Sequence, residues 1–347
     1  MDNAKMILSP RGLRAATSNL LRLAAHGHVA DLRPMPADPV EDGPRRSVYR
    51  YRPPEGVVPA GPPVLFVPPP GAPARCYDLR RGCSLAEHVV RAGRLGYLLD
   101  HGPVRRADHE PDLAEWVSDV LPAAIRAVHR DTGGQPVQLV GWGLGGVVAL
   151  LTAAAGPGLP IASAAVIAAP VDPNAVRHAV MPGPLVKRAY QAAGIDKYMV
   201  RPCLILTHLD NADFLAQAEA IDHFAQEMSG YSGRAAKRIY RALSRNNALM
   251  RGGVEIGGRT VDLADVRVPV LAIAGRGDAV APVRAVLPLI RLLGGAPQVR
   301  FEIAGGGHLD VLTGRSARKT TWRYLDRWLD EGTIRHGIRP QRLTAPG

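Results

Sequence analysis

The sequence has few residues of the kinds on which several protein classes depend. Aromatic residues make up 5% of its 347 residues, too few for the base-stacking surfaces of single-strand nucleic-acid binders. Its cysteines, Cys76, Cys83 and Cys203, are odd in number and irregularly spaced, and they match no zinc or CxxC motif. Free thiols are typical of a reducing compartment. We therefore expect a cytoplasmic protein with no metal site, no cofactor and no nucleic-acid partner.

Long apolar runs are also missing. The N-terminus has neither the apolar stretch nor the small-residue cleavage site of a signal peptide, so we expect none. The most apolar region, residues 147–171, is interrupted by Gly-Pro-Gly at 156–158 and by Pro160. This region therefore does not predict a transmembrane helix.

Charge of one sign is in excess. The chain contains 43 Lys and Arg residues against 31 Asp and Glu residues, a formal net charge of +12. Such a positive field favours anionic ligands, for example acidic lipid surfaces or the phosphates of coenzyme A. A simpler interpretation is that the excess arginine keeps the protein soluble, and this alternative stays open.

Residues 1–61 are predicted to form a helix followed by an irregular lead-in. Residues 6–32 have the pattern of an amphipathic helix, with arginines interleaved among Leu13, Leu20, Leu21 and Leu23. A helix of this kind either packs on its own domain, which we favour, or contacts a membrane or lipid-granule surface. Residues 33–63 are rich in Pro and Gly, with one short strand expected around 47–51.

Short apolar runs then alternate with helical patterns. Strands are expected at 64–68, 95–99, 137–140, 164–168, 268–274 and 298–303. Helices are expected at 84–92, 112–130, 144–154, 283–293 and 317–329. Ser84 and Glu87 have the spacing of a capping box, which opens the first of these helices. Strands alternating with helices predict a mostly parallel sheet with helices on both faces.

The alternation stops between Pro170 and about Asp262. The 171–262 segment is charged and largely helical in pattern, and it separates two strands. Its position predicts a cap inserted over the carboxyl ends of the strands. The core is then built from residues 62–170 and 263–331. Residues 332–347 form a basic tail without periodicity, which we expect to be disordered.

The stretch VGWGLGG at 140–146 lies between a predicted strand and a predicted helix. In a nucleophile elbow, G-x-S-x-G, small flanking residues are required because the strand and the helix crowd together. Gly141, Gly145 and Gly146 satisfy this requirement, but Gly143 stands where the nucleophile is expected. A dinucleotide-binding loop is the weaker alternative, because that loop belongs on the first strand with an acidic residue about 20 positions later.

Two further residues stand where the partners of such a nucleophile are found. Asp278 comes just after the strand at 268–274, and His308 follows the strand at 298–303 in a Gly-rich loop. The order of elbow, Asp and His along the chain is that of an α/β-hydrolase triad. We predict that His308 is a general base and that Asp278 orients it.

From about residue 62 to 330 the chain resembles the catalytic domain of the polyhydroxyalkanoate synthases, a branch of the α/β-hydrolase fold. The similar segments are PVLFVPPPGAPARCYDLRRGCSLAEHVV, the elbow at 141–146, and NNALMRGGVEIGGRTVDLADVRVPVLAIAGRGDAVAP. The resemblance implies an α/β-hydrolase fold with an inserted, largely helical cap, 3-hydroxyacyl-coenzyme A chemistry, and a homodimer that pairs through the cap. It makes Asp278 and His308 the triad acid and base. This chain has Gly143 in place of the family's cysteine, and Val283 where the family has Trp.

Gly143 is expected to preserve the turn and to remove covalent catalysis. Glycine adopts the strained angles of an elbow tip with little cost, but it has no side chain that could form an acyl-enzyme. An oxyanion hole is still predicted, with one donor from the amide of Leu144 and a second from Gly71 or Ala72. The prolines just before Gly71 have no N–H to donate.

Three interpretations of this glycine stay open. In the first, the chain is an enzyme that acts on a small acyl ester, thioester or carbonyl substrate through His308 and Asp278, without a covalent intermediate. In the second, it is a catalytically silent protein that binds an acyl group or acyl-coenzyme A, or docks on an active partner. In the third, Gly143 is an engineered replacement of Ser or Cys. Cys76 is expected to be buried and inert rather than a substitute nucleophile.

Overall fold

The computed structural model describes residues 10–43, 46–102, 111–176, 207–228, 231 and 233–335. Its contacts divide the chain into two compact units. The larger contains Met35–Asp78, Cys83–Ala179 and Glu227–Gly347, and the smaller contains Met1–Pro34, Leu79–Gly82 and Val180–Gln226. The segment 171–262 is shared between the two units, and its role as a cap stays a prediction.

The larger unit is built on an eight-stranded sheet with the order β1-β2-β4-β3-β5-β6-β9-β10. The strands are β1 (Ala37–Glu41), β2 (Ser47–Tyr51), β3 (Val64–Val67), β4 (Gly96–Asp100), β5 (Val137–Trp142), β6 (Ile161–Ile167), β9 (Val270–Gly275) and β10 (Val299–Ala304). Neighbouring strands pair in parallel along the series β4, β3, β5, β6, β9 and β10. At one edge, β2 pairs antiparallel with β4, and β1 pairs antiparallel with β2. Every residue of β3, β5 and β9 is buried, which explains their nearly continuous apolar sequences. The predicted, mostly parallel sheet is therefore confirmed.

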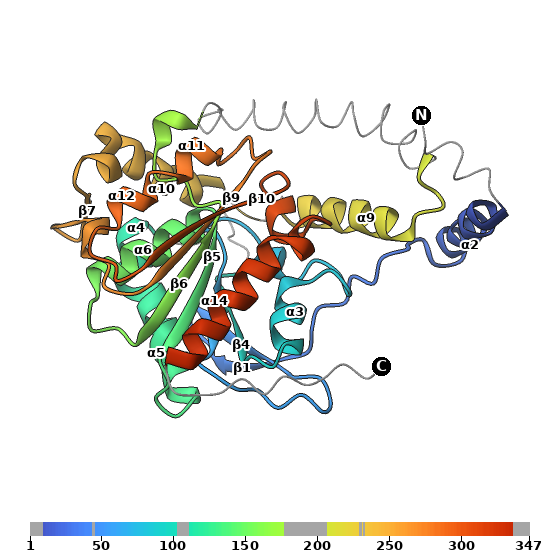
Figure 1. Ribbon diagram of the computed structural model, residues 1–347, viewed down its shortest axis with the longest axis horizontal. Coiled ribbons are helices and arrows are strands. Elements are labelled where there is room, and N and C mark those ends of the chain that lie inside the picture. The colour runs from blue at the N-terminus through green and yellow to red at the C-terminus, as the bar shows by residue number, and fades with distance from the viewer. Residues whose placement is uncertain are drawn as a thin grey trace. The chain divides into compact units, whose positions relative to one another are not determined.

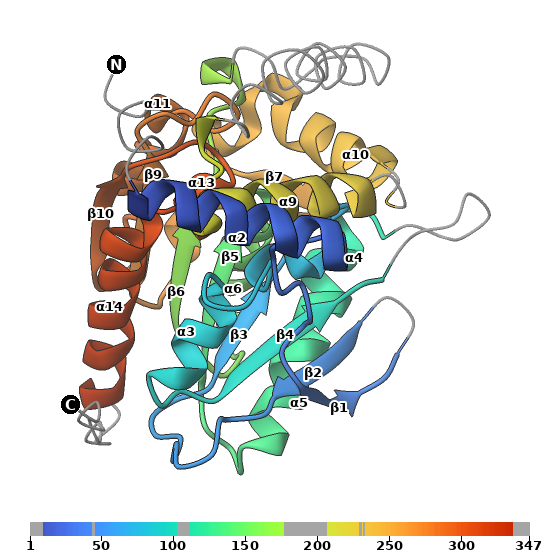
Figure 2. The ribbon, with the colours of Figure 1, turned by 90° about the vertical axis from the view of Figure 1, so that its right-hand side faces the viewer.

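Helices cover both faces of this sheet, as predicted (Figure 1, Figure 2). One face carries α3 (Leu85–Arg91) and α14 (Thr321–Arg335), and the other carries α5 (Leu121–Asp131) and α6 (Leu144–Ala155). Ten of the twelve residues of α6 are buried, as expected for a helix that is apolar on all sides. The Oγ of Ser84 accepts from the amide of Glu87 at 3.0 Å, which confirms the predicted start of α3.

Three predicted helices are interrupted, and a proline explains two of the interruptions; the third, expected at 317–329, is divided at Thr320 into η8 (Ala317–Lys319) and α14. The first becomes α4 (Leu113–Glu115), the π turn η2 (Trp116–Val120) and α5, because Pro122 has no N–H to donate to the carbonyl of residue 118. The second becomes α11 (Val283–Val286) and α12 (Leu289–Leu292), which are separated at Pro288.

Other elements of the larger unit depart from the sequence pattern. β1 lies in the segment expected to be irregular. The region expected to be largely helical contains the hairpin of β7 (Val254–Ile256) and β8 (Arg259–Val261), besides the helix α10 (Gly233–Ser244). α14 continues to Arg335, so the start of the predicted tail is helical, and residues 336–347 lie outside the described residues. The remaining short helices are η1 (Ala74–Tyr77), η3 (Pro173–Ala175), η6 (Arg245–Arg251), η7 (Leu263–Asp265), α13 (Asp310–Thr313) and η8 (Ala317–Lys319).

The smaller unit contains the predicted N-terminal helix, as α2 (Pro10–His26), and most of α9 (Ala212–Glu227). The Glu219 carboxylate accepts from the amides of Val29 and Ala30, the latter at 2.7 Å. Asn19 Nδ2 on α2 donates to the carbonyl of Leu209 at 2.7 Å. These bonds attach α2 and the chain after it to α9 and the residues before it.

The leucines of α2 do not all pack inside this unit. Leu13, Leu20 and Leu21 are 53%, 49% and 65% exposed, whereas Ala16 on the same helix is buried. Contact of this helix with a membrane or granule surface stays a prediction. No helix in the described part of the chain is long and apolar enough to cross a membrane.

Candidate active site

Gly143 forms the turn between β5 and α6. Its φ is 55° and its ψ is −126°, a conformation that costs strain for a residue with a Cβ and little for glycine. The amide of Gly143 donates to the carbonyl of Ile167 on β6 at 2.9 Å, and its own carbonyl accepts from Gly146 at 3.1 Å. The strand, turn and helix predicted at 137–154 are therefore present.

The three flanking glycines have a steric cause. An ideal Cβ on Gly145 would lie 2.3 Å from the carbonyl oxygen of Val67, and one on Gly141 would lie 2.6 Å from the Cα of Gly146. One on Gly146 would lie 2.8 Å from the Cβ of Ala169. Van der Waals contacts between carbon atoms are about 3.5–4.0 Å. None of these positions admits a side chain unless the backbone moves.

Asp278 and His308 lie on the loops after β9 and β10, and the structure brings them together. His308 Nδ1 is 2.8 Å from Asp278 Oδ2. The other carboxylate oxygen, Oδ1, accepts from the amides of Val280 at 2.8 Å and Ala281 at 2.7 Å. Because both carboxylate oxygens act as acceptors, Nδ1 of the imidazole is the donor and Nε2 is left as an acceptor.

The acceptor nitrogen faces the glycine at the tip. An ideal Cβ on Gly143 would lie 3.4 Å from His308 Nε2 and 3.8 Å from Pro69 Cγ, both ordinary contact distances. The His308 side chain is 22% exposed, so water reaches it, whereas the Asp278 side chain is fully buried. A hydroxyl or thiol on that Cβ would lie within hydrogen-bonding reach of the imidazole.

Trp142, next to the tip, is a positioning residue that the sequence argument did not identify. Its Nε1 donates to the backbone carbonyl of His308 at 3.0 Å. The two rings lie 4.8 Å apart between centroids with a tilt of 34°. The indole therefore fixes both the backbone and the ring plane of His308. A large aromatic residue inside an otherwise Gly-rich turn was the available signal.

The predicted donors of an oxyanion hole are only partly supported by the geometry. Leu144 is the first residue of α6, so its amide has no acceptor within the helix. Gly71 has φ of 81° and occupies the third position of a turn that the amide of Ala72 closes by donating to Pro69 O at 3.0 Å. The prediction is wrong for Ala72, because its N–H is already used by this turn. Gly71 stays a prediction for the second donor.

His101, directly after β4, holds the same turn from its other side. Its Nε2 lies 3.3 Å from Pro69 O, and its Nδ1 lies 3.1 Å from the carbonyl of Gly102. Burial lowers the pKa of His101, although the charge of Asp100 opposes this effect. The lowered pKa favours the neutral imidazole, which can donate to one of these carbonyls at a time. The sequence does not single out this residue, because one histidine after a strand carries no distinctive pattern.

The two cysteines in the described part of the chain do not replace the missing nucleophile. Cys76 is completely buried, and burial raises the pKa of its thiol well above the ordinary value. Cys83 is also buried, and its Sγ lies 2.9 Å from the carbonyl of Thr313. Cys203 lies outside the described residues. Within the residues that the structure describes, no three or more His, Cys, Asp or Glu side chains are grouped to hold a metal ion.

Comparisons with known proteins agree with this architecture. The sequence matches the alpha/beta hydrolase family over residues 64–318. It is 24% identical to the poly(3-hydroxyalkanoate) polymerase subunit PhaC of Allochromatium vinosum, over 94% of this chain and 96% of that protein. It is 23% identical to the protein of the same name from Thiocystis violacea, over 82% of this chain and 85% of that protein.

A solved structure supports the same fold. Proline iminopeptidase of Mycobacterium smegmatis superposes with a TM-score of 0.52 at 18% identity, covering 87% of this chain and 100% of that one. At this identity the likeness concerns the fold alone. The sequence relatives agree with the resemblance to the polyhydroxyalkanoate synthases.

Proposed function

The chain belongs to the alpha/beta hydrolase family, and on this premise we propose that it acts on a small acyl ester, thioester or carbonyl substrate with His308 as general base. The observation that carries the proposal is the distance of 3.4 Å between His308 Nε2 and the Cβ position of Gly143. The base is aimed at the place where the reacting oxygen or sulfur of a nucleophile would stand. Gly143 has no such atom, so no acyl-enzyme forms.

In this proposal, water takes the place of the missing nucleophile. His308 Nε2 removes a proton from a water molecule while the water oxygen bonds to the carbonyl carbon of the substrate. The amides of Leu144 and Gly71 stabilise the resulting oxyanion. The carbon–oxygen or carbon–sulfur bond to the leaving group then breaks, and the imidazolium returns the proton to the departing alkoxide or thiolate. Asp278 keeps the ring in the tautomer that can accept the proton.

The relatives suggest the class of acyl group. The two curated relatives are named poly(3-hydroxyalkanoate) polymerase subunits, so we propose 3-hydroxyacyl esters and thioesters as the first substrates to test. Polymerisation on the enzyme requires a covalently held chain, which Gly143 cannot carry. Hydrolysis, or proton removal beside the carbonyl, is the chemistry that the remaining groups allow.

The test compares turnover of 3-hydroxybutyryl thioesters and short p-nitrophenyl esters by four proteins. These are the chain itself, His308→Ala, Gly143→Ser, and His129→Ala, a control at a histidine outside the site whose ring bonds to the carbonyl of Gln135. We expect His308→Ala to lower turnover by about 10²–10⁴, the usual contribution of a general base, and His129→Ala to leave it unchanged. Equal losses in the two variants would contradict the proposal.

Mass spectrometry separates the mechanism from a covalent one. During turnover we expect no acyl adduct on the chain itself and an adduct at residue 143 in Gly143→Ser. An adduct on the original chain at any residue would show that a different nucleophile acts.

The glycine itself favours a second candidate, a catalytically silent protein that binds an acyl group or acyl-coenzyme A. This candidate predicts no turnover by the original chain, a gain of turnover in Gly143→Ser, and binding of the acyl ligand that His308→Ala does not weaken. The same four proteins therefore decide between the two.

A further inference from the structure

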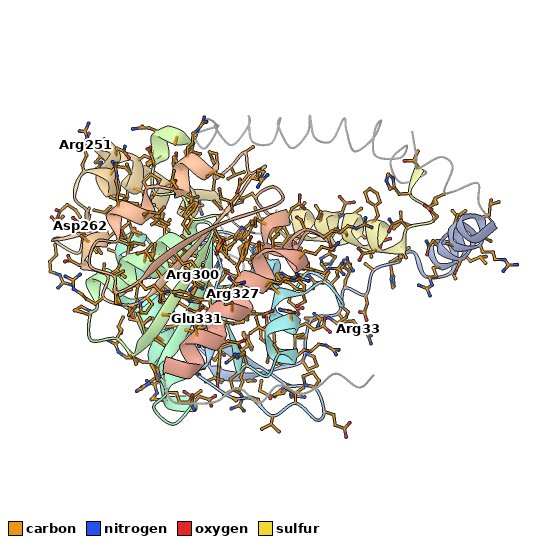
Figure 3. The ribbon with its side chains drawn as sticks, in the orientation of Figure 1. Arg33, Arg251, Asp262, Arg300, Arg327 and Glu331 are labelled. Carbon is orange, nitrogen blue, oxygen red and sulfur yellow. The ribbon has the colours of Figure 1, made fainter. Side chains whose placement is uncertain are left out.

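A hollow in the larger unit is lined by arginines that the proposed reaction does not use. It has a volume of about 650 Å³, and its lining includes Arg238, Arg241, Arg245 and Arg251, together with Glu255 and Thr260. The arginines come from α10 and from η6, and the last two residues come from the hairpin of β7 and β8. Figure 3 labels Arg251 at the edge of the molecule where these elements meet.

The arginines of α10 and of the start of η6 lie on one face because of their spacing. Arg238, Arg241 and Arg245 follow one another at intervals of three and four residues, so their side chains share a face. All three are exposed. Ile239 and Leu243, on the opposite face, are buried and hold the helix on the core.

Three of the four lining arginines carry a charge that no acidic side chain in the described part of the chain neutralises. Within the residues that the structure describes, Arg241, Arg245 and Arg251 form no ion pair. The carboxylate of Glu255, the one acidic side chain of the lining, accepts from the hydroxyl of Thr260. Like charges one helical turn apart repel each other, so this arrangement is stabilised when an anion enters.

The frame around the hollow is fixed by unusual backbone. Asn246 and Asn247, in η6, have positive φ of 54° and 53°, which is uncommon outside glycine. A Cβ on Gly253 would lie 2.6 Å from the carbonyl of Val261. The buried side chain of Leu249 anchors the segment between them. The arginines therefore project from a backbone that curves around the hollow, and this curvature is fixed by the backbone conformation.

We propose that this hollow binds a small ligand carrying two or more linked phosphate groups. Guanidinium groups bind phosphate oxygens with paired, charge-assisted hydrogen bonds, and the three that form no ion pair match the charge of such a ligand. The volume lies within the range of about 300–1,000 Å³ that is typical of small-molecule sites. A concave site favours a compact ligand over a duplex or a membrane surface. This inference does not rest on the proposed reaction.

Calorimetric titration of the full chain with pyrophosphate and with ADP tests the proposal. Both probes carry a diphosphate, and we expect both to bind more tightly than orthophosphate. Tighter binding of ADP than of pyrophosphate identifies a nucleotide-type ligand, and the reverse identifies a free oligophosphate; either result supports the site.

A matched pair of double variants locates the binding. Arg241→Gln with Arg245→Gln removes two charges from the hollow, and Arg323→Gln with Arg327→Gln removes two exposed charges from α14 at the same spacing (Arg327 is labelled in Figure 3). We expect the first pair to weaken diphosphate binding about tenfold or more and the control pair less than about twofold at physiological salt. Glu255→Gln should tighten binding about two- to threefold, because it removes a like charge.

Several results would overturn the proposal. Equal weakening in the two double variants would show that only the general positive field attracts the phosphate. Absence of pyrophosphate and ADP binding at millimolar concentration would exclude the site. Tighter binding of duplex DNA or of phosphatidylglycerol vesicles, lost in the Arg241/Arg245 variant, would assign the same arginines to a macromolecular surface instead. Unchanged thermal unfolding of both variants checks that they are folded.

Discussion

The elbow and the two loops opposite it are constrained in different ways. At the elbow the constraints act on the backbone: the carbonyl oxygen of Val67 lies 2.3 Å from the position of a Cβ on Gly145, and no side chain projects from Gly143. In the loops the constraints act on side-chain atoms, because both oxygens of Asp278 accept hydrogen bonds and His308 is fixed at Nδ1. The elbow keeps its shape by crowding and by backbone hydrogen bonds, and the loops keep theirs by hydrogen bonds to side chains.

The difference explains how an elbow persists without its nucleophile. Its angles are set by neighbouring glycines and by backbone bonds, neither of which involves a side chain at the tip. The imidazole has no such independence, because its direction depends on Asp278 and on the indole of Trp142. We therefore expect substitutions at the elbow to change mainly the stability of the fold, and substitutions in the two loops to change mainly the activity.

The largest effect is expected from a methyl group at Gly145. Gly145→Ala places a carbon 2.3 Å from a backbone oxygen of β3, which cannot turn away as a side chain can. We expect a loss of about 3 kcal/mol or more in the free energy of unfolding. Gly143→Ala is the matched control, since its Cβ has room and meets only the strain of a positive φ, about 1–3 kcal/mol. Urea unfolding of both variants measures the comparison, and equal losses would show that crowding does not shape the elbow.

The next effect concerns activity and comes from the loop side. In Asp278→Asn the amide Oδ1 can still accept from Val280 and Ala281, but Nδ2 would donate to Nδ1 of His308. The ring proton then moves to Nε2, which faces the tip and can no longer accept a proton. We expect turnover to fall by about 10²–10³ with little change in thermal stability. Full activity in this variant would show that the carboxylate does not set the tautomer.

The smallest effect is a pH dependence at the turn beside the elbow. Burial lowers the pKa of His101 from its ordinary value near 6.5, so as pH falls below that value the unfolded chain binds a proton before the folded chain does. Stability is therefore lost toward acid, with a slope of at most about 1.4 kcal/mol per pH unit from this group.

His101→Gln removes this contribution and retains a donor for the carbonyl of Pro69. Urea unfolding between pH 5 and 8 should show a shallower acid limb in the variant and a constant difference between the two proteins above pH 7.5. A difference that does not change with pH would mean that His101 does not titrate between the two states.

The sequence predicted much of the larger unit because its signals are local. Strands buried on both faces have apolar sequences, which made them predictable. The spacing of Ser84 and Glu87 predicted the start of α3. The loops of Asp278 and His308 could be placed together because the carboxyl ends of parallel strands meet at one edge of a sheet. The hairpin of β7 and β8 had a local signal as well, a Gly-Gly pair between the alternating triplet VEI and the triplet RTV, although we expected a largely helical segment there.

The rest depends on contacts that the sequence pattern does not record. β1 has the sequence ADPVE, whose residues show no alternation, and it becomes a strand because β2 offers it a pairing edge. The amide of Ala72 was assigned to the oxyanion hole because the chain alone does not reveal that Pro69 accepts it. The contacts of Trp142 and His101 likewise join segments far apart in the chain.

The room over residue 143 has a genetic consequence. Glycine codons that end in a pyrimidine become serine or cysteine codons by one base change. A Cβ at residue 143 would lie 3.4 Å from His308 Nε2, its nearest neighbour, and would overlap no atom. Neither replacement therefore needs a second mutation to make space. Where the codon of Gly143 ends in a pyrimidine, a single base change therefore gives a hydroxyl or thiol next to His308.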